Sequence, residues 1–413
     1  MKDRLNILFI GKYPPYVGGE TTKIYWLLRA LAERGHKIYV VSNGWELPLE
    51  WSCKITLDDL DYLQFKNLKL FSTSFHSTPF FIPPYNPMTE KLASLGIEVI
   101  ENYDVDIIFS WYLIPFCSVA FILSKITGIP YVISNAGSDI HRLFRSIYYQ
   151  DYLIEIIKNA QGVITYRSSE RIMRNLNKNV MIHGFPVDPD WYVTKPIKYS
   201  KNRRLIELVQ LYSYDKYVDK NTMILEKTIN DNKKILVVPS KWEKSKGIYQ
   251  WVTLAKKLSD TVTLLLIGNG FIRNEILKEI RDLDNVIWLP FIPTWRMPEI
   301  YSCVDLVGHL EINFPVPHHH SLVVIEAQLS GKPILTNLEI KFILNSKNLN
   351  VFKITLDEYN HININDELIR FISESKVDII FKDENLELLR NYWISRVKNV
   401  ENFLWKCNDK ESK

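Results

Sequence analysis

The loop at residues 239–247 carries two lysines that could bind one anion. It follows an apolar run, residues 235–238, that predicts a buried strand, and it places Lys241 and Lys246 five positions apart. In open α/β sheets, ligands bind beyond the carboxyl ends of the strands. Both ammonium groups could therefore reach one diphosphate, although a lysine-rich loop taken alone is more often a solvated turn.

A histidine-rich segment opens a predicted helix at residues 322–329, and Glu326 lies in the second turn of that helix. The residues at its start are His318, His319, His320, Ser321 and Leu322. The carboxylate could accept hydrogen bonds from a diol such as a ribose, or it could pair with a nearby cation. Consecutive histidines of an extended segment point to opposite faces, and no further Cys or His stands at zinc-ligand spacing. We therefore expect no bound metal.

A third candidate site is the turn at residues 11–19, which follows the first predicted strand. Gly18 and Gly19 stand where this turn enters a helix. Without side chains, their backbone N–H groups and the positive helix end could approach a phosphate. A plain tight turn is the alternative. The G-x-G-x-x-G fingerprint of dinucleotide-binding proteins does not occur.

These loops connect apolar strands that alternate with helices. The predicted strands are residues 5–10, 37–42, 106–110, 130–134, 162–165, 235–238, 262–267, 286–289, 306–309 and 333–336. The predicted helices are residues 24–34, 113–126, 151–158, 168–177, 248–258, 272–281, 322–329 and 386–404. Fully apolar strands between helices are typical of parallel sheets covered on both faces. The sequence therefore predicts an α/β protein with two doubly wound, Rossmann-like domains that face a central cleft.

The domain junction is expected where this alternation fades. Residues 189–232 are a mixture of Pro, Lys, Asn and Tyr, so we assign them to a linker or insertion between domains at 1–188 and 233–385. Its basic side chains form either a solvated surface or a contact with a membrane or acceptor. Residues 386–413 form a terminal helix with an apolar stripe at helical spacing. The stripe consists of Leu386, Leu389, Trp393, Val397, Val400 and Leu404.

Composition narrows the class of protein. The chain has 413 residues with 46% hydrophobic and 24% charged side chains, which is typical of a globular protein. Its net charge of +4 is too mild for a nucleic-acid-binding face. The four cysteines lie far apart and no signal peptide is recognisable, so we expect reduced thiols and a cytoplasmic location. The apolar stretch at residues 107–123 is interrupted by polar residues and proline, which favours a buried strand and helix over a membrane span.

The order and separation of these motifs resemble the retaining GT-B glycosyltransferases of family 4, the glycosyltransferase group 1 superfamily. The resemblance covers most of the chain. In the first half it rests on Tyr13-Pro14-Pro15 with Gly18-Gly19 and on Arg34-Gly35-His36. In the second half, residues 240–247 are similar to the family motif Gly-Arg-x4-Lys-Gly, residues 318–326 to Glu-x7-Glu, and residues 325–334 to LEAmacGxPV.

The resemblance implies a nucleotide-diphosphate sugar as co-substrate, held mainly by the C-terminal domain, and an acceptor held mainly by the N-terminal domain. Lys241 and Lys246 would hold the diphosphate and Glu326 the ribose hydroxyls, while amides near His320, Ser321 and Leu322 would meet the phosphates. It implies retention of configuration without a metal or other cofactor, because cations and amide dipoles stabilise the departing diphosphate. It also implies that the terminal helix packs back toward the N-terminal domain.

Three positions depart from the family pattern. The family's His-Gly-x-Asp loop is Ala136-Gly137-Ser138-Asp139 here, so the imidazole is missing and Asp139 remains as a catalytic candidate. The first glutamate of Glu-x7-Glu is His318, which we expect to donate a hydrogen bond to sugar hydroxyls. The arginine of the basic pair is Lys241, which keeps the charge but loses the bidentate fork.

The motifs together favour a hexosyltransferase of polysaccharide, glycolipid or glycoprotein-glycan assembly. Its acceptor would be a glycan or a lipid-linked glycan, and it would contact the inner face of an anionic membrane peripherally. One alternative is a degenerate GT-B protein that binds a nucleotide or a partner without transferring sugar. The other is a sugar-nucleotide epimerase of the same architecture, which no motif supports.

Overall fold

The computed structural model describes residues 3–74, 87–183, 187–193, 200–313, 321–339, 350–375 and 383–409. The chain forms two compact units, and each contains its own parallel sheet. Unit 1 consists of Met1–Pro48, Asp58–Val187 and Asn391–Lys413. Unit 2 consists of Leu49–Leu57 and Asp188–Arg390. The prediction of an α/β protein with two parallel-sheet domains is confirmed.

Unit 1 contains a seven-stranded sheet with the order β3-β2-β1-β4-β5-β6-β7. Its strands are β1 (Asn6–Ile10), β2 (Lys37–Ser42), β3 (Leu68–Ser72), β4 (Ile107–Trp111), β5 (Tyr131–Ser134), β6 (Gly162–Thr165) and β7 (Val180–Ile182). The central strands β1, β4 and β5 are buried along their whole length, as expected for a sheet covered on both faces. The strand order reverses between β1 and β4, which is the point where such sheets bind ligands.

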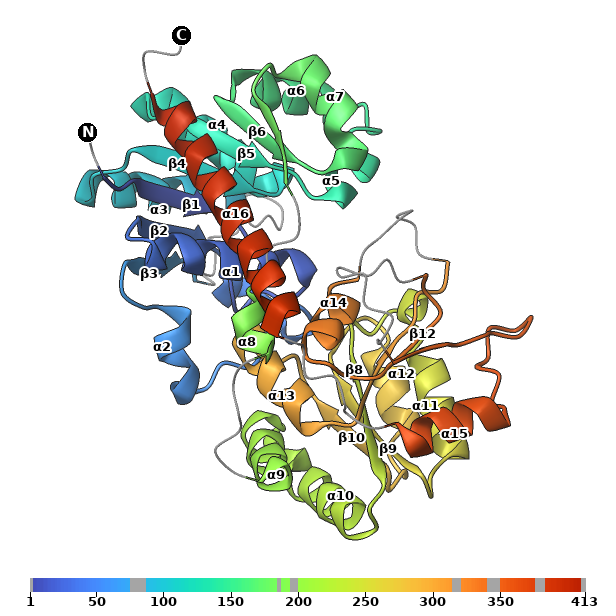
Figure 1. The fold of residues 1–413 in the computed structure, drawn as a ribbon. Coiled ribbons are helices and arrows are strands. Elements are labelled where there is room, and N and C mark those ends of the chain that lie inside the picture. Colours follow the sequence, from blue (N-terminus) through green and yellow to red (C-terminus); the bar gives the residue numbers. More distant parts are fainter. Residues whose placement is uncertain are drawn as a thin grey trace, which may run out of the picture. The chain divides into compact units, whose positions relative to one another are not determined.

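The helices of unit 1 follow the alternation with strands, and Figure 1 shows them around the sheet. They are α1 (Gly19–Glu33), α2 (Leu60–Leu63), α3 (Met88–Asn102), α4 (Ser118–Thr127), α5 (Gly137–Arg142), α6 (Gln150–Asn159) and α7 (Glu170–Leu176). The stretch at residues 107–123 becomes β4, an irregular turn (Leu113–Cys117) in which Ile114 has non-helical backbone angles, and part of α4. Among the helices that the structure describes, none is long and apolar enough to cross a membrane.

Unit 2 contains a six-stranded parallel sheet with the order β10-β9-β8-β11-β12-β13. Its strands are β8 (Lys234–Pro239), β9 (Val262–Ile267), β10 (Val286–Leu289), β11 (Leu306–His309), β12 (Ile334–Thr336) and β13 (Val351–Lys353). Its helices are α8 (Pro189–Val193), α9 (Lys201–Tyr212), α10 (Val218–Asn230), α11 (Ile248–Lys257), α12 (Arg273–Glu279), α13 (Met297–Cys303), α14 (Leu322–Leu329) and α15 (Asp366–Glu374). The segment assigned from sequence to a linker therefore contributes α8, α9 and α10 to this unit.

The terminal helix α16 (Asp383–Asn408) packs against unit 1 from Asn391 onward. The Glu401 carboxylate lies 2.6 Å from the guanidinium of Arg34 and 2.9 Å from Nε2 of His36. These partners belong to the Arg-Gly-His segment that precedes β2. The prediction that the terminal helix packs on the N-terminal domain is thereby confirmed.

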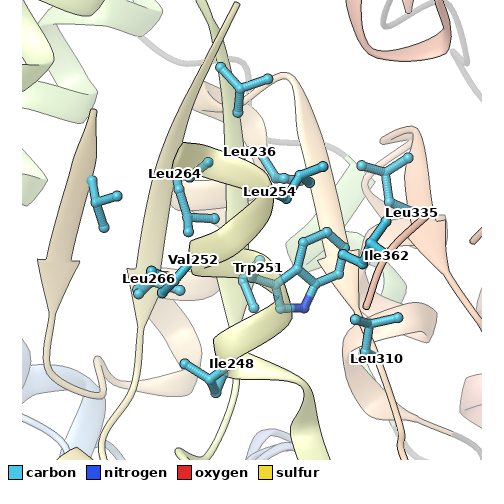
Figure 2. Close-up of a cluster of buried hydrophobic side chains, with 14 of the residues drawn as sticks. Leu236, Ile248, Trp251, Val252, Leu254, Leu264, Leu266, Leu310, Leu335 and Ile362 are labelled. Atoms are coloured by element: carbon cyan, nitrogen blue, oxygen red, sulfur yellow. The ribbon is translucent and has the colours of Figure 1, made fainter. Parts of the chain in front are cut away.

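The core of unit 2 is centred on an indole. Trp251 of α11 is fully buried among aliphatic side chains from the sheet and from α11 itself (Figure 2). A Cβ atom on Gly308 of β11 would lie 2.8 Å from the indole Cη2 and 2.9 Å from a methyl group of Val238. The glycine therefore provides the space that the indole occupies.

We predict that Gly308→Ala lowers the free energy of unfolding of unit 2 by about 1–3 kcal/mol, because overpacking forces neighbouring side chains to shift. In a Trp251→Leu background the same substitution should cost about 1 kcal/mol less, because the indole is gone. Urea unfolding of the four proteins gives this double-mutant cycle. An equal cost in both backgrounds would show that the indole does not require the glycine.

Candidate active site

Lys246 lies at the end of the short 3-10 helix η7 (Lys244–Lys246), just before α11. Gly247 adopts a left-handed conformation with φ of 63°, which turns the chain from this loop into the helix. The Lys246 ammonium lies 2.6 Å from Oε1 of Glu311, and both side chains are largely buried. An ammonium and a carboxylate therefore meet at the carboxyl end of the unit 2 sheet.

Lys241 contacts a different group. Its Nζ lies 4.3 Å from the ring centroid of Trp51, which in turn packs edge-on against Phe271. Trp51 belongs to Leu49–Leu57, a segment from the first part of the chain that forms part of unit 2. The two lysines thus have different neighbours in this structure, and their binding of one diphosphate stays a prediction.

The polar cluster around Glu311 was not predicted from the sequence. Its backbone N–H donates to Oδ1 of Asn337 at 3.0 Å, and Nε2 of His309 lies 3.3 Å from its carboxylate. Glu311 follows β11 by two residues, and Asn337 follows β12 directly. The rule that ligands bind after the strands could have identified both positions.

Glu326 lies on α14 and is buried. Its Oε1 accepts a hydrogen bond from the Tyr192 hydroxyl at 2.8 Å, and its Oε2 accepts one from Tyr301 at 3.0 Å. Burial raises the pKa of this carboxyl to about 7, although both hydroxyls act in the opposite direction. Neither tyrosine was anticipated from the sequence, where a diol and a cation were the partners considered.

Ser321 and Leu322 lie at the start of α14, as the sequence predicts. Ser321 is the N-terminal capping residue, and its side chain makes no capping hydrogen bond. Free backbone N–H groups at a helix N-terminus favour anions. His318 and His320 lie outside the described residues, as does His319.

In unit 1, Gly18 and Gly19 form the entry to α1. Gly18 has φ of 121°, a conformation that other residues rarely adopt. The next residue, Glu20, accepts hydrogen bonds from Lys23 at 2.8 Å and from the Tyr166 hydroxyl at 2.9 Å. The N-terminus of α1 therefore already has a carboxylate in its first turn.

Asp139 lies in α5, beyond the carboxyl end of β5. Its Oδ2 accepts hydrogen bonds from the backbone N–H groups of Ala136 at 3.0 Å and Leu113 at 3.1 Å. Its Oδ1 is buried and has no hydrogen-bond partner among the residues that the structure describes. Burial raises the pKa of this carboxyl to about 7 against the opposing effect of the two N–H groups and Lys12.

Lys12 is the second residue after β1, and Tyr112 is the first residue after β4. The strand order reverses between these two strands. Nζ of Lys12 lies 3.7 Å from the ring centroid of Tyr112. Burial lowers the pKa of Lys12, although Asp139 and Glu20 oppose this shift. Tyr112 has φ of 85°, a strained conformation for a bulky residue that is often found at functional sites.

Neither unit offers metal ligands in the described part of the chain, where no group of three His, Cys, Asp or Glu side chains could hold an ion. The charged groups described above include the Lys246–Glu311 pair of unit 2 and Lys12 and Asp139 of unit 1. Such groups are suited to binding anions and hydroxyl-rich molecules.

Comparison with known proteins gives the family. Residues 17–180 match the family model described as Glycosyltransferase Family 4, and residues 219–386 match the one described as Glycosyl transferases group 1. Together these matches cover more than half of the chain. The chain belongs to the family 4/group 1 superfamily of GT-B glycosyltransferases.

Three proteins similar to this glycosyltransferase share at most 22% sequence identity with it. MJ1607, an uncharacterized glycosyltransferase of Methanocaldococcus jannaschii, is 22% identical over 339 residues, which are 79% of this chain and 78% of that protein. HepE (Alr3699) of Anabaena has a TM-score of 0.58 at 15% identity, covering 97% of this chain and 99% of its own. The catalytic domain of starch synthase IV from Arabidopsis thaliana has a TM-score of 0.59 at 15% identity, with 98% and 99% covered. At these identities the solved structures support the fold alone.

We predict that Glu326→Gln becomes more stable relative to the wild type as the pH rises. The carboxyl pKa is raised from 4.5 to about 7, so between these pH values the folded protein keeps a proton that the unfolded chain releases. The wild-type protein therefore loses stability as the pH rises from 4.5 to about 7. Glutamine does not ionise. Between pH 5 and pH 8 the stability difference should therefore move about 2 kcal/mol in favour of the variant.

Urea unfolding at both pH values measures this difference. Glu358→Gln, at an exposed position of the same unit, is the control and should keep a nearly constant difference from the wild type. A constant difference for Glu326→Gln as well would show that its carboxyl is not protonated in the folded protein.

Proposed function

We propose that this glycosyltransferase transfers a sugar from a nucleotide-diphosphate sugar to a glycan, glycolipid or glycoprotein-glycan acceptor. The resemblance to the family suggests that the transferred sugar is a hexose. The ion pair of Lys246 with Glu311 carries the proposal. A nucleotide sugar offers partners to both members of this pair, since its phosphoryl oxygens suit an ammonium and its sugar hydroxyls suit a carboxylate. HepE was solved in complexes with UDP-glucose and with UDP and glucose, and the starch synthase domain with ADP and acarbose.

Lys246 is proposed to act on the leaving diphosphate. Negative charge grows on the diphosphate as the sugar bond breaks, so an ammonium aimed at it stabilises the transition state more than the ground state. Lys241 is proposed to supply the second cation. The amides at the start of α14 would face the phosphates, and His318 would bind sugar hydroxyls.

Glu326 is proposed to bind the ribose. Its two oxygens already accept hydrogen bonds from Tyr192 and Tyr301, which fix the orientation of the carboxylate. Each oxygen has a further lone pair that a ribose hydroxyl could use. This contact is similar in the ground and transition states, so it would affect donor binding more than turnover.

Unit 1 is proposed to hold the acceptor at the point where its strand order reverses. Oδ1 of Asp139, which no described residue contacts by a hydrogen bond, can accept one from an acceptor hydroxyl, and Lys12 can donate to a second oxygen. The reaction is proposed to retain the anomeric configuration, to need no metal and to serve glycan assembly in the cytoplasm, in peripheral contact with a membrane.

We predict that Lys246→Gln lowers kcat about a hundredfold while changing the donor KM much less, because about 3 kcal/mol of transition-state stabilisation is lost. Lys244→Gln is the matched control, since Lys244 lies exposed in the same loop. It should leave both constants nearly unchanged. Glu326→Gln should mainly raise the donor KM.

The donor is first chosen by thermal shift with a panel of nucleotide sugars, because a ligand of the folded protein raises its melting temperature. Melting curves of the variants show whether each one folds. If both lysine substitutions had equally small effects in folded proteins, the loop would not be part of the active site.

We also predict that turnover is unchanged by EDTA and that the new glycosidic bond has the anomeric configuration of the donor. Positive side chains and amide dipoles would replace a metal at the leaving group. EDTA saturated beforehand with calcium is the control, and proton NMR of the product reports its configuration. Activity lost in EDTA and restored by manganese would contradict metal independence, and an inverted product would contradict retention.

A further inference from the structure

A pocket of about 330 Å³ opens in unit 1 where the terminal helix α16 packs beside the edge strand β7. The strand contributes Met181 and Ile182, and the next residue, His183, also lines the pocket. The helix contributes residues between Arg396 and Lys406. Small-molecule sites begin at about this volume. None of these residues belongs to the candidate sites described above.

The helix wall of the pocket is polar and carries two positive charges. Its members are residues 396, 399, 402, 403 and 406, a spacing that places them on one face of α16. Arg396 and Lys406 are ten positions apart, which is about 15 Å along a helix. Between them, Asn399 and Asn402 have exposed side chains. Lys406 donates to Oδ1 of Asn179 at 3.3 Å, and its ammonium can donate two further hydrogen bonds.

The other wall of the pocket comes from the sheet and is largely apolar. Met181 and Ile182 are partly buried there. His183 is neutral near pH 7, because burial lowers its pKa to about 3 and the positive charges of Lys23 and Arg396 act in the same direction. The charge of the pocket therefore comes from the helix.

Carboxylates do not balance this charge among the described residues that line the pocket. Glu401 of α16 forms an ion pair with Arg34 at 2.6 Å, and Glu170 of α7 forms one with Arg174 at 2.8 Å. Asp409 lies at the end of the described helix and does not line the pocket. The pocket therefore attracts anions.

We propose that this pocket binds an acidic oligosaccharide, with Arg396 and Lys406 pairing with two carboxylates of its chain. Ammonium and guanidinium groups form strong, charge-assisted hydrogen bonds with carboxylates. The amides of Asn399 and Asn402 can donate to and accept from sugar hydroxyls. The apolar wall suits the C–H face of a sugar ring. This inference rests on the proposed function and deepens it, because the bound chain would be the glycan acceptor or the product.

The spacing of the two cations favours a chain over a single phosphate group. Cations about 15 Å apart along a helix match anions that recur along a polymer. A nucleic acid is less suited, because single strands bind through bases that stack on aromatic rings. Phe403 is the aromatic residue of the pocket, and only 9% of its surface is exposed.

The position of the pocket also suits an acceptor. His183 follows β7 at its carboxyl end, and its ring packs edge-on against Trp111 with the centroids 5.7 Å apart. Trp111 is the last residue of β4 and precedes Tyr112. The inner wall of the pocket is therefore close to the point where the strand order reverses, which is proposed to hold the acceptor.

The test is calorimetric titration of the full-length protein, without donor, with the tetramer of galacturonic acid and with its methyl ester, which has the same hydroxyls and no charge. The wild type should bind the acid tetramer about tenfold more tightly than the ester, and high salt should abolish this preference. Arg396→Gln with Lys406→Gln should weaken binding of the acid tetramer about tenfold and leave binding of the ester nearly unchanged. Asn399→Ala with Asn402→Ala should weaken both several-fold.

A matched control removes two positive charges from unit 1 outside the pocket. Lys158 of α6 and Lys398 of α16 are exposed and do not line it. Lys158→Gln with Lys398→Gln should leave binding of both tetramers nearly unchanged. Melting curves show whether each variant folds.

Three results would overturn the proposal. The first is that the wild type binds neither tetramer or binds both equally, and the second is that the Arg396 and Lys406 variant binds the acid tetramer as the wild type does. The third is tighter binding of octathymidylate or of phosphatidylglycerol vesicles through these two cations, which would assign the pocket to nucleic acid or lipid. Pocket-dependent binding of the acid tetramer by a protein without transferase activity would support the pocket and contradict the proposed function. Transfer without such binding would do the reverse.

Discussion

Burial of both faces of a parallel sheet is the constraint on which the arrangement of this protein depends. Strand positions must be apolar when helices cover both faces of the sheet. Polar side chains that could bind a ligand or take part in catalysis therefore lie in the loops that follow the strands. In unit 1 this places Lys12 after β1 and Asp139 after β5. In unit 2 it places Lys246 after β8 and Glu311 after β11. One architecture, repeated, thus produces two separate groups of charged side chains.

The same constraint decides what the sequence can predict. Central strands such as β9 and the buried helix α14 have bounds that agree with the apolar runs, because full burial requires apolar residues. The edge strands β3 and β7 were not predicted. Each has a neighbouring strand on one side only, and most of their residues are only partly buried or exposed. Helix α9 was assigned to a linker since its surface is rich in lysine and arginine, although Leu205, Leu208, Val209 and Tyr212 form a buried stripe.

The sequence pointed to some residues of the candidate site, but not to their contacts. Lys246 and Glu326 could be selected from the local spacing of charged residues beside apolar elements. Their partners come from distant parts of the chain: Glu311 is 65 positions from Lys246, and Tyr192 is 134 positions from Glu326. No local pattern specifies such pairs, because they depend on how the strands are ordered in the sheet. The inclusion of Leu49–Leu57 in unit 2 is unpredictable for the same reason.

The two buried carboxyls, Asp139 and Glu326, differ in a way that bears on their roles. Burial raises the pKa values of both carboxyls to about 7. Both oxygens of Glu326 accept hydrogen bonds from tyrosine hydroxyls within unit 2. Within the described part of the chain, Oδ1 of Asp139 has no such partner, and a buried polar atom without one costs stability. Next to it, Tyr112 keeps a strained backbone conformation. Two separate costs at the point where the strand order reverses are more easily explained by ligand binding than by the stability of the fold.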